Sequence, residues 1–183
     1  MTGFADNGGA SRWRTARWGM AAVLLLLPLI AMQLTGEVNW DGFDFAAAAT
    51  LIFGALLAYE LATRAGSLAY RAALAVALAA AFLLVWINLA VGIIGSENNP
   101  ANLMFAGVLA VGIAGAIVAR LRPAGMTRAL LTTALAQVAV GLIAILSGMG
   151  QFASPPLEFL GLTGIFTALW LVSAWLFRRA ARR

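Results

Sequence analysis

The longest apolar stretch of the chain runs from residue 68 to residue 95 and reads LAYRAALAVALAAAFLLVWINLAVGIIG, with Arg71 as its single charged residue. Its apolar residues are continuous and do not alternate with polar ones, which indicates a helix and not a half-exposed strand. A helix needs about 20 predominantly apolar residues to cross the hydrocarbon core of a bilayer. The stretch therefore predicts a membrane-spanning helix, tilted or extending beyond the lipid because of its extra length.

Five more apolar stretches are similar to this one. They occupy residues 18–34, 43–61, 103–119, 129–149 and 157–177, and connectors that contain Gly or Pro separate them. Of all residues, 63% are hydrophobic and only 10% are charged, whereas a soluble domain carries about 25% charged residues. The sequence lacks the alternating segments, about ten residues long, of a membrane β-barrel. We therefore predict an all-α polytopic membrane protein with six transmembrane helices.

The charged residues indicate how these helices are oriented. All 12 basic residues are arginines, in four clusters at 12–17, 64–71, 120–128 and 178–183. The connectors on the other side contain no arginine, and five acidic residues lie in or beside them: Glu37, Asp41, Asp44, Glu97 and Glu158. Because arginine is enriched on the cytoplasmic side, both termini are expected in the cytoplasm. The abundance of Ala and Arg without any Lys suggests a bacterial protein, so the expected location is the bacterial inner (plasma) membrane.

The domain organisation predicted from the sequence is simple. Residues 1–11, rich in Gly, Asn and Asp, are expected to form a flexible cytoplasmic tail, and residues 12–183 a single six-helix transmembrane domain. Residues 71–79 (RAALAVALA) match residues 128–136 (RALLTTALA) at most positions. This repeat fits three tandem helical hairpins, about 12–66, 67–125 and 126–183, which would be parallel repeats. Chance similarity between helices rich in Ala and Leu is the alternative.

Two residue types that carry much protein chemistry are missing. The chain has no Cys and no His, which excludes disulfides, thiolate nucleophiles, haem ligation by histidine and most zinc and copper sites. The absence of Lys excludes Schiff-base catalysis, and neither a nucleophile elbow nor a phosphate-binding loop occurs. We therefore expect no enzyme, no cofactor and no metal centre. Binding to nucleic acid is not expected either, because the arginines lie between apolar runs and not along one face.

Polar residues concentrate in and beside the outer connectors. Carboxylate and amide oxygens are ligands that Ca²⁺ or Mg²⁺ accepts, and acidic residues attract cations. The candidates for a ligand or cation site are therefore Glu37, Asp41, Asp44, Glu97, Asn98, Asn99, Asn102 and Glu158. The alternative is that outer loops are polar for solvation alone. In the densest run, Asn98 or Asn99 is expected to cap the fourth helix, with Pro100 in its first turn.

Three polar side chains within the predicted spans are further candidates: Glu60, Asn88 and Gln137. An ionisable residue in a span suggests a functional site, here a relay for protons or cations. For Glu60 the alternative is an ion pair with Arg64 at i+4. Asn88 and Gln137 could line a narrow path, or could form hydrogen bonds between helices that contribute about 0.6 kcal/mol each.

Small residues indicate faces where helices can approach one another closely. The fourth span carries most of them, and the sixth has two more: Ala106, Gly107, Ala110, Gly112, Ala114 and Gly115, then Gly161 and Gly164. We therefore expect the fourth span to be the helix most enclosed by protein.

These features favour two functions. The small-residue faces and the scarcity of charge in the spans favour a non-catalytic accessory or scaffold component of a membrane assembly. The repeat and the acidic outer residues favour the alternative, a small oligomeric channel or transporter for a cation or small solute with an acidic outer vestibule. The expected partners are the lipid bilayer and either further copies of the chain or a larger membrane complex.

Overall fold

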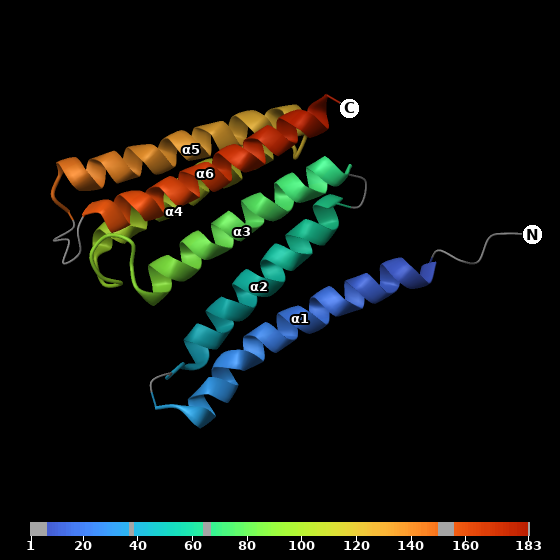
Figure 1. Cartoon of the computed structure of the whole chain (residues 1–183), viewed down its shortest axis with the longest axis horizontal. Helices are drawn as coiled ribbons and strands as arrows, with labels where there is room; N and C mark the ends of the chain where they lie inside the picture. Colours follow the sequence, from blue (N-terminus) through green and yellow to red (C-terminus); the bar gives the residue numbers. More distant parts are fainter. Residues whose placement is uncertain (1–6, 37–38, 64–66, 150–155, 183) are drawn as a thin grey trace, which may run out of the picture. The chain divides into compact units, whose positions relative to one another are not determined.

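The computed structural model describes residues 7–36, 39–63, 67–149 and 156–182. In these ranges the chain forms α-helices joined by short connectors (Figure 1). The helices are α1 (Asn7–Leu34), α2 (Gly42–Thr63), α3 (Leu68–Ala90), α4 (Met104–Ala119), α5 (Pro123–Leu146) and α6 (Pro156–Ala181), and the 3₁₀ helix η1 (Pro100–Leu103) leads into α4. The described ranges contain no strand, so the prediction of an all-helical protein is confirmed.

Five helical segments within the described residues are long and apolar enough to cross a membrane: Arg12–Leu34, Leu68–Ala90, Pro100–Ala119, Pro123–Leu146 and Leu157–Ala181. These helices have the character expected of a membrane protein. α2 is not among them, and it carries an acidic residue near each end, Asp44 and Glu60. Five of the six predicted spans thus correspond to helices of spanning character.

The third span is shorter than the sequence predicts, because α3 ends at Ala90 and not at residue 95. Gly92 and Gly95 have positive φ angles of 72° and 75°, a conformation that residues with a Cβ rarely adopt. A Cβ at Gly92 would overlap the backbone of Ser96. Ile93 and Ile94 are buried without being helical, and their hydropathy is the reason that the predicted span was too long.

The chain divides into two compact units, Met1–Leu61 and Ala62–Arg183. In the first unit, the ring of Trp18 on α1 stacks on Phe53 of α2, with the ring centroids 5.8 Å apart. The guanidinium of Arg17 lies 5.7 Å from the centre of the Tyr59 ring. α1 begins at Asn7, so residues 7–11, expected as part of a tail, are helical. Residues 1–6 lie outside the described residues.

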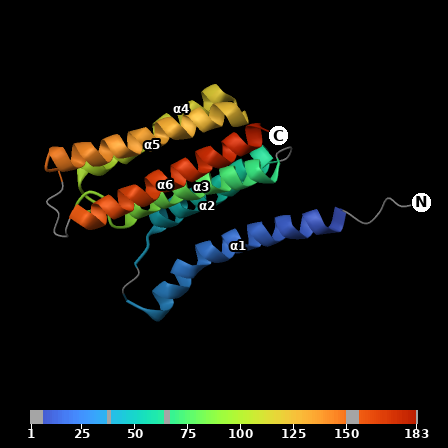
Figure 2. The ribbon, with the colours of Figure 1, turned by 45° about the horizontal axis from the view of Figure 1, so that its top comes forward.

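The second unit contains α3 to α6, which pack in the spatial order α3, α6, α5, α4 (Figure 2). Tyr70 contacts Phe177 edge to face, and the Ser173 hydroxyl donates a hydrogen bond of 2.7 Å to the carbonyl oxygen of Ala73. From the first of these contacts to the second, the residue numbers rise along α3 and fall along α6, so the two helices are antiparallel. Contacts between α3 and α4 are few. The predicted hairpin 67–125 is therefore not a closely packed helix pair, and the three-hairpin arrangement stays a prediction.

α4 and α5 approach closely through glycine. A Cβ built on Gly115 would lie 2.7 Å from the Cβ of Ala129, and one on Gly112 would lie 3.2 Å from the hydroxyl oxygen of Thr133. Both distances are shorter than the usual contact of about 3.5–4.0 Å between carbon atoms. Small side chains at these two positions are thus what allows the two helices to pack.

The expectation that the fourth span is the most enclosed was wrong. In the spanning window of α5, 39% of residues are buried, against 17% in the window that contains α4. Three alanines of the predicted α4 face are exposed: Ala106, Ala110 and Ala114. A Cβ on Gly161 or Gly164 of α6 would meet nothing within 4 Å. A row of small residues permits close packing, but it does not specify which of them a neighbouring helix will contact.

Candidate ligand site

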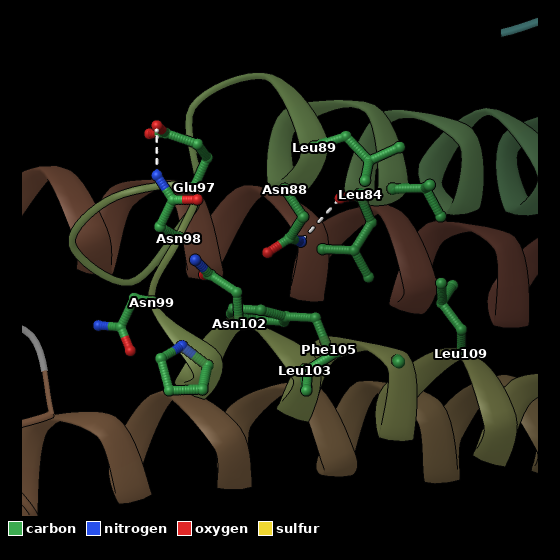
Figure 3. A pocket seen from close by; sticks show the side chains of 13 residues that line it. Leu84, Asn88, Leu89, Glu97, Asn98, Asn99, Asn102, Leu103, Phe105 and Leu109 are labelled. Atoms are coloured by element: carbon green, nitrogen blue, oxygen red, sulfur yellow. Dashed lines mark hydrogen bonds between the residues drawn. The ribbon is translucent and has the colours of Figure 1, made fainter. Parts of the chain in front are cut away.

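A cavity of about 370 Å³ lies within the second unit, between the last turns of α3 and the beginning of α4 (Figure 3). Its apolar wall comes from both helices and η1: Leu84, Val85, Leu89, Leu103, Phe105 and Leu109. Its polar rim contains half of the predicted outer cluster: Glu97, Asn98, Asn99 and Asn102, joined by Asn88 from α3. The structure therefore brings four of the eight outer candidates together at one cavity.

Asn102 organises the connector that forms one side of the cavity. Its Oδ1 accepts hydrogen bonds from the backbone N–H groups of Ile93 at 3.0 Å and Ile94 at 2.8 Å. Its Nδ2 donates a hydrogen bond of 2.7 Å to the carbonyl oxygen of Ser96. Backbone groups of buried residues need such partners, and here one amide side chain satisfies those of Ile93 and Ile94 and also bonds the exposed Ser96. Asn102 thus has a structural role at the site.

Asn99 and Pro100 begin η1 as the sequence predicted. The Oδ1 of Asn99 accepts a hydrogen bond of 3.0 Å from the backbone N–H of Ala101, and Pro100 occupies the first turn. The Nδ2 of Asn99 donates to the carbonyl oxygen of Met149 at 3.0 Å. This second hydrogen bond ties the cavity rim to the end of α5. Asn99 thus caps η1, which leads into α4, whereas α4 itself begins after Leu103 without a side-chain cap.

The remaining rim residues differ in how their polar atoms are used. Asn98 and Glu97 are exposed, and the Nδ2 of Asn98 donates to a carboxylate oxygen of Glu97 at 2.9 Å. The Nδ2 of Asn88 donates to the carbonyl oxygen of Leu84, four residues earlier on α3, at 2.8 Å. The Oδ1 of Asn88 is buried and has no hydrogen-bond partner. Figure 3 shows Asn88 extending from α3 towards Asn102 and Phe105 on the opposite side.

The other outer candidates occupy different places in the chain. Asp41 and Asp44 cap the start of α2, since each carboxylate accepts a hydrogen bond of 3.0 Å from the backbone N–H of the other residue. This reciprocal arrangement satisfies two N–H groups at a helix N-terminus. Glu158 is exposed in the first turn of α6 and does not line the cavity. Glu37 lies outside the described residues.

The described ranges contain no cluster of three or more acidic side chains that could hold a metal ion. The cavity itself has one carboxylate, that of Glu97, among its lining residues. Ca²⁺ takes on the order of six oxygen ligands in proteins, and the lining of the cavity offers this carboxylate and the asparagine side-chain oxygens.

A second set of polar groups lies in the interior of the second unit. Gln137 on α5 is fully buried, and neither its Nε2 nor its Oε1 has a hydrogen-bond partner. The hydroxyl of Thr163 and the indole N–H of Trp170, both on α6, are also buried without a partner. The Thr133 hydroxyl donates to the carbonyl oxygen of Ala129 in its own helix at 2.9 Å. Most of these polar groups are thus enclosed by the helix packing.

Glu60 is in contact with α1. The indole N–H of Trp18 donates a hydrogen bond of 3.0 Å to a carboxylate oxygen of Glu60, in partly buried surroundings. The predicted partner Arg64 lies outside the described residues, so the ion pair stays a prediction. No local sequence pattern indicates that a residue 42 positions earlier would form a hydrogen bond with Glu60. The only sequence signal is that both residues lie near the same predicted membrane surface.

The fold and the site define a helical protein of membrane type, with a cavity that is apolar along the helices and polar at their ends. No known protein family, curated protein or solved structure gives a significant match to the chain. Sequence reasoning found the polar rim but not the apolar wall. The sequence contained one indication of the apolar wall: Leu84 and Phe105 each lie about one turn of helix from an asparagine of the rim.

Proposed function

We propose that the chain crosses the bacterial inner membrane six times, as three consecutive helical hairpins, with both termini in the cytoplasm. Five helices of spanning character support this. α2, with 22 residues, would extend about 33 Å at 1.5 Å per residue, which suffices for a hydrocarbon core about 30 Å thick. Between Asp44 and Glu60 it has no charged residue. In this arrangement all arginine clusters lie on the cytoplasmic side, as the positive-inside rule requires.

Cysteine accessibility tests this topology, because the chain contains no Cys of its own. Single cysteines at Thr35, Ser96 and Ser147 are expected to react with an impermeant thiol reagent added outside intact spheroplasts. Cysteines at Ala124 and Ala181 should react only after the membrane is opened. If α2 did not cross the membrane, the four positions that follow it would exchange their accessibility while Thr35 kept its own. That exchange would refute the six-span proposal.

We further propose that the protein is a non-catalytic accessory or scaffold component of a membrane assembly. The observation that carries this proposal is the complete burial of Gln137. One turn before it, Thr133 lies against Gly112 of α4, and one turn after it, Gly141 lies against Thr163 of α6. The interior at this depth is thus occupied by packed side chains. A transport path would need the deepest polar groups to face a lumen, and this packing favours a structural role for them.

One observation favours the alternative, a small oligomeric channel or transporter for a cation or small solute. Gln137, Thr163 and Trp170 together present four buried polar atoms without partners. Such atoms are commonly satisfied by ordered water, and a chain of waters through the unit would connect them. In that case, Gln137 would be the residue on which conduction depends.

A single preparation distinguishes the two functions. The full chain is extracted in native nanodiscs, its particle mass and co-purifying chains are measured, and solute and proton flux is measured after reconstitution into liposomes. The accessory function predicts a stoichiometric second protein and no flux above that of empty vesicles. A homo-oligomer whose flux is abolished by Gln137→Leu at unchanged particle mass would establish the alternative instead.

A further inference from the structure

The amide nitrogens at the rim of the cavity between α3 and α4 each have a hydrogen-bond partner in the protein. All four amide nitrogens on its rim donate to acceptors of the protein at 2.7–3.0 Å: Asn88 to Leu84, Asn98 to Glu97, Asn99 to Met149 and Asn102 to Ser96. The side-chain oxygens of Asn99 and Asn102 also accept hydrogen bonds from the backbone. Each amide nitrogen keeps a second N–H, but among the described residues that line the cavity no amide nitrogen is buried without a partner.

Two acceptor groups at the cavity, in contrast, can accept further hydrogen bonds. The Oδ1 of Asn88 is buried at the cavity without a partner. The carboxylate of Glu97 uses one oxygen for Asn98, and a carboxylate accepts up to about four hydrogen bonds. The lining includes this one negative charge and no arginine. A head group that satisfies the Asn88 oxygen must donate a hydrogen bond, and the Glu97 carboxylate favours a cation or a neutral group over an anion.

The rest of the cavity is suited to an alkyl chain. Leu84 lies six residues before the end of α3, and Leu109 lies five residues inside α4, so the apolar wall extends about 8–9 Å along the helices at 1.5 Å per residue. Both helices belong to segments of spanning character. The polar rim therefore lies at the level where a span ends, and the apolar wall at the depth of lipid chains.

We infer that this cavity binds a membrane amphiphile with a hydrogen-bond-donating head group that carries no net negative charge, such as an alkyl amine or an alkyl alcohol. The head group lies between the Asn88 oxygen and the Glu97 carboxylate, and the chain lies against Leu84 and Leu109. The inference is independent of the accessory role, but it requires that α3 and α4 lie in the membrane. A volume of about 370 Å³ is near the lower end of the range of about 300–1,000 Å³ for small-ligand sites.

Water alone fits the cavity less well. A volume of about 370 Å³ would have to be filled by several water molecules. Every buried water needs two to four polar partners, on the order of three, and the wall formed by leucines, a valine and a phenylalanine supplies none. An amphiphile matches both halves of the cavity at once.

Photolabelling of the full chain tests the inference. Three probes with the same diazirine-bearing alkyl chain and different head groups (amine, alcohol and carboxylate) are added to the protein in phosphatidylcholine nanodiscs at pH 7. Labelled peptides are identified by mass spectrometry. The amine and the alcohol are expected to label residues 84–109 in a saturable manner, with competition by the unlabelled amine. The carboxylate is expected to label these residues at least about tenfold less.

Matched substitutions at Asn88 and Glu97 separate the contributions of these two acceptors to head-group binding. Asn88→Leu removes the buried acceptor and is expected to reduce labelling by the amine and the alcohol by about tenfold. Asn88→Asp retains an acceptor and adds charge, so it should raise the ratio of amine to alcohol labelling. Glu97→Gln should lower that ratio and leave the alcohol unchanged. Circular dichroism and thermal unfolding of each variant show whether the helices are retained.

Three results would overturn the inference. Equal labelling by the three head groups would show an unselective lipid-facing groove. Labelling by the amine that Asn88→Leu does not change would place the head group elsewhere. No labelling of residues 84–109 by any probe would show that water, another part of the protein or a second copy fills the cavity.

Discussion

Replacing Gly115 with alanine is expected to separate α4 from α5. The new Cβ would lie 2.7 Å from the Cβ of Ala129 and 3.1 Å from its Cα, whereas carbon atoms in contact are normally about 3.5–4.0 Å apart. Neither atom of Ala129 can rotate away, because one belongs to the backbone and the other is attached to it. The helices must therefore move apart by about 1 Å, and packing along their shared interface weakens.

The magnitude follows from two opposing effects. Overpacking in a well-packed interior costs about 1–3 kcal/mol, and the higher helix propensity of alanine over glycine returns up to about 1 kcal/mol. At Gly107 of the same helix and at Gly164 of α6, a Cβ would meet nothing within 4 Å, so only the favourable effect applies. Because the gain in helix propensity is common to all three variants, we expect Gly115→Ala to be less stable than either control by the overpacking cost alone, about 1–3 kcal/mol.

The assay is reversible unfolding of the full chain in mixed micelles with increasing SDS, followed by circular dichroism. Each 1.4 kcal/mol corresponds to about a tenfold change in the unfolding constant, so the difference should lie between about fivefold and about a hundredfold. If Gly115→Ala and Gly164→Ala had equal stabilities, the close packing of α4 on α5 described above would be wrong. A further check is Ala129→Gly, which removes the opposing Cβ and should restore part of the loss when combined with Gly115→Ala.

Three other predictions concern individual polar side chains. Asn102→Leu removes three hydrogen bonds from the connector and should destabilise it by about 3 kcal/mol. Hydrogen exchange at residues 93 and 94 should accelerate, whereas Asn102→Asp, which retains the acceptor, should protect them. Gln137→Leu removes two buried polar atoms without partners and should stabilise the protein by about 1 kcal/mol in the SDS assay. A loss of similar size would show that the amide has partners, such as water. Trp18→Phe removes the hydrogen bond to Glu60 and should weaken the packing of α1 on α2 by about 1 kcal/mol, seen as faster hydrogen exchange in α1; unchanged exchange would contradict a stabilising role for this bond.

The helices could be predicted from the sequence because their apolar runs are long and uninterrupted, and because Gly or Pro lies in each connector. The end of α3 could not. Hydropathy continues through Ile93 and Ile94, but the backbone leaves the helix at Val91 and turns at Gly92. Burial outside a helix produces the same local signal as burial within one. The N–H groups released there are satisfied by Asn102, eight or nine residues later, and no local pattern reports that pairing.

The polar rim was predictable in part. Asn99 before Pro100 is a capping pattern with a local cause, and the structure confirms it. Asp41 and Asp44 were predicted as cation candidates, but their spacing also has a local explanation, since two acids three residues apart can cap one helix. Tertiary contacts such as Trp18 with Glu60, or Ser173 with the Ala73 carbonyl oxygen, depend on which helices become neighbours. The periodicity of one helix alone does not determine which other helix packs against it.

Asn88 and Gln137 show most clearly what the sequence cannot predict, because in the sequence both are a single amide within an apolar span. In the structure, the unpartnered oxygen of Asn88 lies at a cavity lined partly by the connector between α3 and α4. Gln137, in contrast, is fully buried between helices. An unsatisfied polar atom at an accessible cavity can be satisfied by a ligand, whereas the same atom in a sealed interior only destabilises the fold unless water reaches it. Substitution by leucine should therefore have opposite consequences: at Asn88 it should reduce ligand binding with little change in stability, and at Gln137 it should raise stability without affecting ligand binding.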